Sequence, residues 1–168
     1  SKTTFQREKI AKPWFRAAVA AGYNFRMSNV LAAIGVEQLK KVDKMNTLRR
    51  KHAAYLNKHL KNIKGIEIPT EAKNCKHVYQ MYTVKLKSGN RDKFVLELRK
   101  KGIGASVHFD PPVHLQPFYK KNYGCKKGDF PITEKAAESI VTLPMYPALI
   151  KKELDYIIIN IKKIYGSI

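Results

Sequence analysis

The sequence has 168 residues, of which 44% are hydrophobic and 27% are charged. This apolar content is enough for a folded core, and it excludes a disordered tail. No apolar run approaches the roughly 18 residues that a membrane-spanning helix needs. We therefore expect a folded domain, or a large piece of a larger protein, with no membrane segment.

The charge is strongly positive, because 33 Lys and Arg stand against 13 Asp and Glu for a net charge of +20. Such a charge attracts polyanions, and it leaves three explanations open. The chain could bind nucleic acid, it could bind a small phosphate-bearing substrate, or it could present a lysine-rich solvated surface. Basic residues are spread over the whole chain, in pairs such as Lys40–Lys41 and Lys126–Lys127. Their distribution does not decide among the three.

A long helix is predicted from Ser28 to about Leu60, within a linking segment at 28–62. Residues 1–27 precede it and end in a loop, and the Ser28 hydroxyl can cap the helix by accepting a free backbone N–H. Apolar residues then recur with a helical period at Leu31, Ile34, Leu39, Val42, Met45, Leu48, Ala53, Leu56 and Leu60. Such a helix would be about 50 Å long, a length that often links two domains.

Residues 63–168 have the pattern of a small α+β domain. In chain order the predicted elements are a strand at 66–68, a strand at 78–86, a helix at 91–101, a strand at 105–109, a proline-rich loop at 110–128, a helix at 133–142 with Thr133 as a possible cap, and a helix at 151–165. We therefore expect a long linking helix followed by a small, mostly antiparallel sheet with flanking helices.

The segment from His108 to Tyr119, HFDPPVHLQPFY, has the most unusual local composition, with two histidines, three prolines and several aromatic rings. It follows the end of a predicted strand, where a rigid scaffold often presents functional loops. Its prolines restrict the backbone and reduce the entropy lost on binding. A stiff surface loop packed by its own rings explains the composition equally well, and both explanations stay open.

The segment Gly22–Met27, GYNFRM, places Asn24 and Arg26 just before the predicted helix. A helix N-terminus favours an anion, and an arginine adds a forked donor for phosphate or carboxylate. The alternative is local, with Asn24 in a turn and Arg26 on the surface.

No metal site or hydrolytic catalytic group is expected. His52 and His59 are seven residues apart, whereas two ligands on adjacent helical turns need three or four. Cys75 and Cys125 lack CxxC spacing, so they do not predict a zinc site, and we expect two reduced thiols in a cytoplasmic protein. The sequence has no nucleophile-and-base pair and no glycine-rich phosphate loop.

Three stretches carry a resemblance to a known family. They are GYNFRMSNVLAAIGVEQLKKVDKMNTLRRKHAAYLNKHL at 22–60, VHFDPPVHLQPFY at 107–119, and GDFPITEKAAESIVTLPMYPALIKKELDYIIINIKK at 128–163. Together they resemble the DegT/StrS-type sugar aminotransferases, whose patterns include GYNyR, H-y-x-P-x-H-x-Q-P-x-Y and F-P-x-A-E. Phe25, Phe109 and Thr133 depart from the tyrosines and alanine that the family often has there.

The resemblance implies the C-terminal small domain of a fold-type-I, pyridoxal-phosphate-dependent enzyme. Such an enzyme moves an amino group, usually from glutamate, to a ketone on a nucleotide-linked sugar, and works as a homodimer with shared active sites. The implied cofactor-binding residues are Asn24, which acts in the neighbouring subunit, with Arg26 and Tyr23 beside it. The implied substrate-binding residues are His108, Phe109 and His114.

The resemblance also implies a part that this sequence lacks. The family's cofactor lysine lies on a Ser-Phe-x-x-x-Lys stretch upstream of GYN, and nothing similar precedes Gly22. We therefore expect residues 1–27 to be the tail of a missing large domain, no catalytic residue in this chain, and no activity of the chain alone. The alternatives are a non-catalytic regulatory relative or a basic module that binds anions or nucleic acid, although the resemblance does not favour nucleic acid.

Overall fold

A computed structural model describes residues 27–108 and 110–167. The chain divides into two compact units, Ser1–Gln38 and Leu39–Ile168. Their boundary falls inside the long helix. The domain boundaries expected from the sequence, after residues 27 and 62, stay predictions.

The long helix, α2, runs from Asn29 to Leu60, as the sequence predicted. It begins at the expected cap, where the Ser28 Oγ accepts from the backbone N–H of Leu31 at 3.3 Å. Its apolar residues become steadily more buried along the chain. Leu31, Ile34 and Leu39 are exposed, Val42, Met45 and Leu48 are half-buried, and Ala53, Leu56 and Leu60 are buried. The C-terminal half of α2 therefore belongs to the core of the second unit.

The described residues form one antiparallel sheet with the strand order β1-β2-β3. Its strands are β1 (Ile66–Glu67), β2 (Tyr82–Leu86) and β3 (Ile140–Leu143). Gly65 makes the turn into β1 with a φ of +88°, and a Cβ there would lie 2.0 Å from the Tyr165 hydroxyl. This position therefore requires glycine on both conformational and steric grounds.

The sheet corrects three predictions. Residues 78–81 are not part of β2, and the strand expected at 105–109 is reduced to a single bridge between Ser106 and Thr142. The helix predicted at 133–142 ends at Ser139, and the next four residues form β3. Val141 pairs with Val84 of β2, so long-range pairing of β-branched residues outweighs the local helical pattern.

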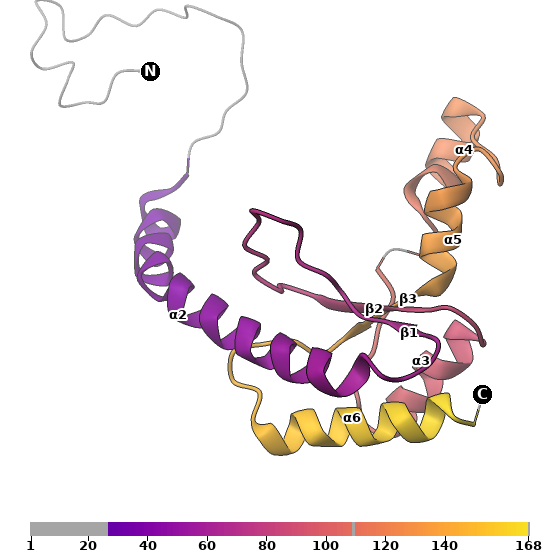
Figure 1. The fold of residues 1–168 in the computed structure, drawn as a ribbon. Coiled ribbons are helices and arrows are strands. Elements are labelled where there is room, and N and C mark those ends of the chain that lie inside the picture. The colour runs from indigo at the N-terminus through magenta and orange to yellow at the C-terminus, as the bar shows by residue number, and fades with distance from the viewer. Residues whose placement is uncertain (1–26, 109, 168) are drawn as a thin grey trace, which may run out of the picture. The chain divides into compact units, whose positions relative to one another are not determined.

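Five further helical segments complete the described fold. They are α3 (Arg91–Lys100), η1 (Val113–Leu115, a 3-10 turn), α4 (Pro117–Tyr123), α5 (Pro131–Ser139) and α6 (Lys151–Tyr165). In Figure 1, α3 and α6 lie on one side of the sheet, while α4 and α5 lie on the other. None of the helices in the described residues combines the length and apolarity that a membrane crossing needs.

The proline-rich segment at 110–128 is more ordered than predicted, because it contains η1 and α4. Pro117 occupies the first turn of α4, and Gly124 ends it in the left-handed conformation with a φ of 66°. Both are favourable positions for these residues. Likewise α5 begins at Pro131 after the cap residue Phe130, so Thr133 is not its cap.

The core lies between the sheet and the helices α2, α3 and α6. Its largest fully buried side chains are Tyr82, Phe94, Leu56, Leu60, Leu98, Leu143, Ile161, Val84 and Val141. The α+β architecture expected from the sequence is confirmed: a long helix followed by a small antiparallel sheet with flanking helices.

Candidate functional site

Some of the residues that the sequence singled out lie outside the described part of the chain. These are Tyr23, Asn24 and Arg26 ahead of α2, and Phe109 in the loop after the Ser106 bridge. Their proposed contacts with cofactor and substrate stay predictions. The described residues of the site are therefore His108, His114 and their surroundings.

His108 is half-buried and follows the bridge that joins Ser106 to Thr142 of β3. Two residues on, the Asp110 carboxylate accepts a hydrogen bond from the Arg91 guanidinium at 2.7 Å. The Arg91 side chain is only 10% exposed, and it also donates to the Ala137 carbonyl at the end of α5. Arg91 thus ties the start of the loop to α5.

His114 lies inside the loop and is 8% exposed. Its Nε2 is 3.0 Å from the Oε1 of Glu134, which is equally buried in the first turns of α5. The ring of Phe130 packs edge-on against the imidazole, with centroids 4.9 Å apart. The sequence singled out His114 but missed Glu134, although Glu134 belongs to the F-P-x-A-E-like stretch.

The Glu134 carboxylate also accepts from the peptide backbone ahead of its own helix. The N–H of Gly128 donates to both oxygens, at 2.8 and 3.0 Å, and the N–H of Phe130 donates at 3.3 Å. The pKa of Glu134 is lowered, first by the hydrogen bond from His114 and then by these backbone donors, against the opposing effect of burial. The group is therefore a carboxylate, and Nε2 of His114 is its donor.

Exposed aromatic side chains gather on α4, just beyond His114. Phe118, Tyr119 and Tyr123 are 61%, 36% and 68% exposed, and their rings contact one another at centroid distances of 5.3–6.3 Å. No residue of α4 is buried. The helix is therefore a projecting element that carries little of the core.

A second polar cluster joins α2 to the segment between β1 and β2. The Arg50 guanidinium donates to both oxygens of Glu71, and the backbone N–H of His77 donates to the same carboxylate at 2.8 Å. The Arg50 hydrogen bond, helped by His77, lowers the pKa of Glu71 to about 2. Arg50 lies within the family-like stretch at 22–60, but its partner Glu71 lies outside that stretch.

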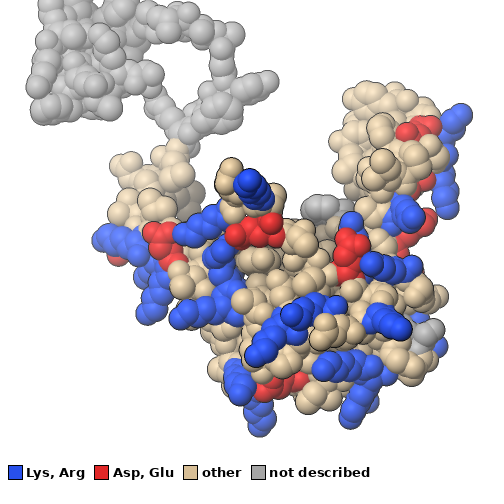
Figure 2. Space-filling view, in the orientation of Figure 1, with Lys and Arg blue, Asp and Glu red and all other residues tan. Residues whose placement is uncertain are grey.

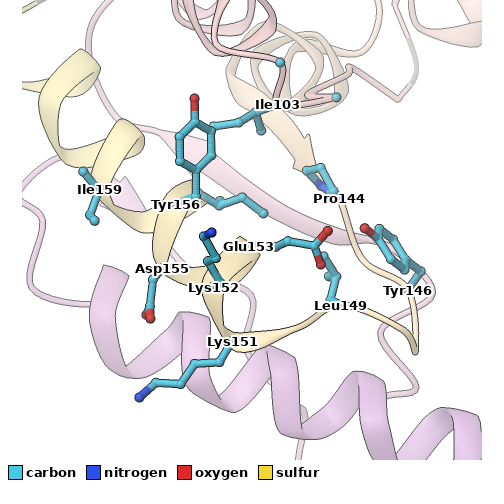
Figure 3. A pocket seen from close by; sticks show the side chains of 13 residues that line it. Ile103, Pro144, Tyr146, Leu149, Lys151, Lys152, Glu153, Asp155, Tyr156 and Ile159 are labelled. Carbon is cyan, nitrogen blue, oxygen red and sulfur yellow. The ribbon is translucent and has the colours of Figure 1, made fainter.

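A hollow of about 730 Å³ lies between α6 and the turns at 102–104 and 144–149 (Figure 3). Its carboxylates already have structural partners: Asp155 accepts from the Tyr55 hydroxyl at 2.5 Å, and Glu153 accepts from the Ile150 N–H at 2.9 Å. The Tyr156 hydroxyl donates to the Lys101 carbonyl. Of the predicted site residues that the structure describes, neither His108 nor His114 lines this hollow.

Basic side chains are distributed over the face shown in Figure 2, and acidic and neutral side chains lie among them. Every lysine in the described part of the chain is exposed. A lysine that forms a Schiff base with pyridoxal phosphate is activated by desolvation or by a neighbouring cation, and the exposure of these lysines does not favour that role. Within the same residues, no group of three or more His, Cys, Asp or Glu side chains is arranged to hold a metal ion.

Comparison with known proteins places these features in a family. The chain matches the DegT/DnrJ/EryC1/StrS aminotransferase family model over residues 2–162. Over 99% of its length, the chain is 36% identical to an uncharacterized protein of Methanocaldococcus jannaschii, and the match covers 44% of that protein. Over 86% of its length, it is 30% identical to the dTDP-3-amino-3,6-dideoxy-alpha-D-galactopyranose transaminase of Aneurinibacillus thermoaerophilus, and the match covers 38% of that protein.

A solved structure agrees with the sequence comparisons. DesV of S. venezuelae, in complex with a ketimine intermediate, superposes with a TM-score of 0.79 at 28% identity, over 86% of this chain and 38% of DesV. The chain thus spans about two fifths of the length of the relatives that it matches. On this match, the chain belongs to the DegT/DnrJ/EryC1/StrS aminotransferase family.

Proposed function

We propose that this chain is the C-terminal portion of a pyridoxal-phosphate-dependent aminotransferase that acts on a nucleotide-linked keto sugar. The observation that carries the proposal is the family match over residues 2–162, together with a relative named as a dTDP-sugar transaminase. The amino donor is proposed to be glutamate. The enzyme is proposed to act in the cytoplasm, in the biosynthesis of cell-surface polysaccharide.

The cofactor lysine is proposed to lie outside this chain. The exposure of every described lysine supports this, because none is a desolvated amine of the kind that favours Schiff-base chemistry. When bound, pyridoxal phosphate would act as the electron sink for amino transfer. The role of this chain is then to bind and orient, and by itself it is inactive.

The proposed binding residues come from two places in the chain. Asn24, with Tyr23 and Arg26, contributes to the cofactor site of the other subunit in a homodimer with shared active sites. His108 and Phe109 face the acceptor sugar nucleotide. The burial of His114 against Glu134 favours a supporting role inside the same loop over a direct substrate contact.

The test is amino transfer by the longer protein that carries this chain. The protein is incubated with pyridoxal phosphate, ¹⁵N-labelled amino-group glutamate and a nucleotide-linked keto sugar, and mass spectrometry detects the ¹⁵N-amino sugar. Transfer of the label supports the proposal, and its absence for every nucleotide-linked keto sugar offered would contradict it.

The basic-module alternative predicts a different measurement. Phosphate contacts make nucleic-acid affinity fall steeply with salt. Binding of duplex DNA by this chain with a steep salt dependence, combined with no amino transfer by the longer protein, would favour the alternative. The basic side chains on the visible face, which are mixed with acidic ones, do not favour it.

A further inference from the structure

One buried carboxylate, that of Glu134, joins three segments of the chain. It accepts from His114 in η1, from the backbone N–H groups of Gly128 and Phe130 in the turn after α4, and it belongs to α5 itself. These segments enclose α4 on both sides. Glu134 therefore closes the base of the projection formed by residues 113–130.

Little else fixes this projection. No residue of α4 is buried, and its three aromatic rings are exposed and contact one another. Hydrogen bonds to a charged group are the stronger kind, and in a buried place they are screened less by water than on the surface. The buried hydrogen bonds at its base, and not the burial of α4 itself, therefore hold this helix in place.

The hydrogen bonds of Glu134 to His114, Gly128 and Phe130 form a tie between these segments. Through His114, this tie also reaches the segment proposed to face the substrate. His114 is four residues after Asp110, and Arg91 holds Asp110 at the other end of that short stretch. Two anchors, the Arg91–Asp110 pair and the His114–Glu134 pair, therefore bracket the backbone that follows His108 and Phe109. A loop fixed at both ends loses less entropy when it binds a ligand.

We propose that Glu134 and His114 are positioning residues for the acceptor sugar nucleotide: they hold the loop at 110–123 in the arrangement that binds the acceptor, and His114 acts through the loop without touching the substrate. This inference rests on the proposed function for the identity of the ligand. The tie itself does not, because it consists of contacts within this chain.

The first experiment tests the tie by amide hydrogen exchange in Glu134→Gln, which keeps the side-chain size and removes the charge. Glu138→Gln is the matched control, because Glu138 lies one turn further along α5 and its 3.6 Å pair with Lys127 is exposed. We expect the Gly128 and Phe130 amides to exchange about tenfold faster in Glu134→Gln, with β2 protected as before and the control unchanged. Unchanged exchange at both amides in Glu134→Gln would overturn the inference.

Two further measurements test the tie even if the Glu134→Gln variant fails to fold. In the unmodified chain, ¹⁵N NMR of the His114 ring should show the proton on Nε2 at neutral pH, and a ring with Nε2 unprotonated would overturn the assignment. His114→Gln keeps the Gly128 and Phe130 bonds to Glu134, so it offers a milder loss. Its loop amides should exchange faster while β2 stays protected, and unchanged loop exchange would again count against the tie.

The second experiment measures the consequence for substrate in the longer protein. We expect Glu134→Gln to raise the KM for the acceptor sugar nucleotide about tenfold, while the half-reaction with glutamate keeps its rate and Glu138→Gln behaves as the unmodified enzyme. An unchanged acceptor KM, or equal losses with both substrates, would overturn the positioning role. If the unmodified enzyme transfers no amino group to any nucleotide-linked sugar, the proposed function fails, and with it the acceptor role, while hydrogen exchange still decides whether the tie exists.

Discussion

Glu71 shows how a single exposed carboxylate can anchor a segment without regular secondary structure. Its pKa is lowered to about 2, chiefly by the Arg50 guanidinium and then by the His77 N–H. A carboxyl whose pKa is lower in the folded than in the unfolded state stabilises the fold above its ordinary pKa, here 4.5. That contribution is lost as the pH falls toward 2.

We therefore predict that the segment at 69–81 detaches from α2 in acid before the core unfolds. Between pH 4.5 and 2, its amides should lose protection or its proteolysis should accelerate, and Glu71→Gln should show the loosened state already at pH 7. Glu67→Gln is the control, because its pair with Lys85 is 3.6 Å long and half exposed. A segment that is equally protected at pH 7 in Glu71→Gln would contradict this.

At the scale of elements, α2 combines a buried and an exposed half. Leu56 is fully buried in the core of the second unit, whereas Leu31 is 60% exposed. Leu56→Ala should therefore lower the free energy of unfolding by about 2–5 kcal/mol, and Leu31→Ala in the same chain should change it by no more than about 0.5 kcal/mol. Urea unfolding measures both, and similar losses would show that the first half of the helix is packed.

Whether the sequence predicts an element correctly depends on whether the signal for that element is local or comes from long-range pairing. Helix α2 and helix α6 were predicted to within a residue, because caps and helical periodicity are local signals. Strand β3 was mistaken for the end of a helix, because its state depends on pairing with β2, more than 50 residues away. Helix α4 was missed although Pro117 and Gly124 mark its ends, since the surrounding prolines indicated an irregular loop.

The candidate site was likewise predicted only in part. Motif resemblance drew attention to the loop around His114 and to the stretch that contains Glu134, but it did not join them. Their contact spans 20 residues of chain and is produced by the turn between α4 and α5. Neither residue spacing nor periodicity encodes such a pair, so only the folded structure identifies it.

At the scale of the whole molecule, the chain spans about two fifths of its relatives, and its proposed role is shared between subunits. We predict that a subunit lacking the cofactor lysine and a subunit carrying Asn24→Ala regain activity when mixed. In the heterodimer one site lacks both groups while the other has both. Asn24→Ala alone should reduce activity, because it would remove the proposed hydrogen bond to a charged partner, a kind of bond worth about 1.5–3 kcal/mol. A mixture that stays inactive despite proven heterodimers would show that Asn24 does not act across the interface.

The most direct test is borohydride reduction in the presence of pyridoxal phosphate, followed by peptide mapping. We predict no stoichiometric, unique pyridoxyl-lysine in this chain. In the longer protein we predict one such lysine, outside these 168 residues. A single, fully labelled lysine among residues 1–168 would contradict the central claim that this part of the enzyme binds and orients while another part holds the cofactor.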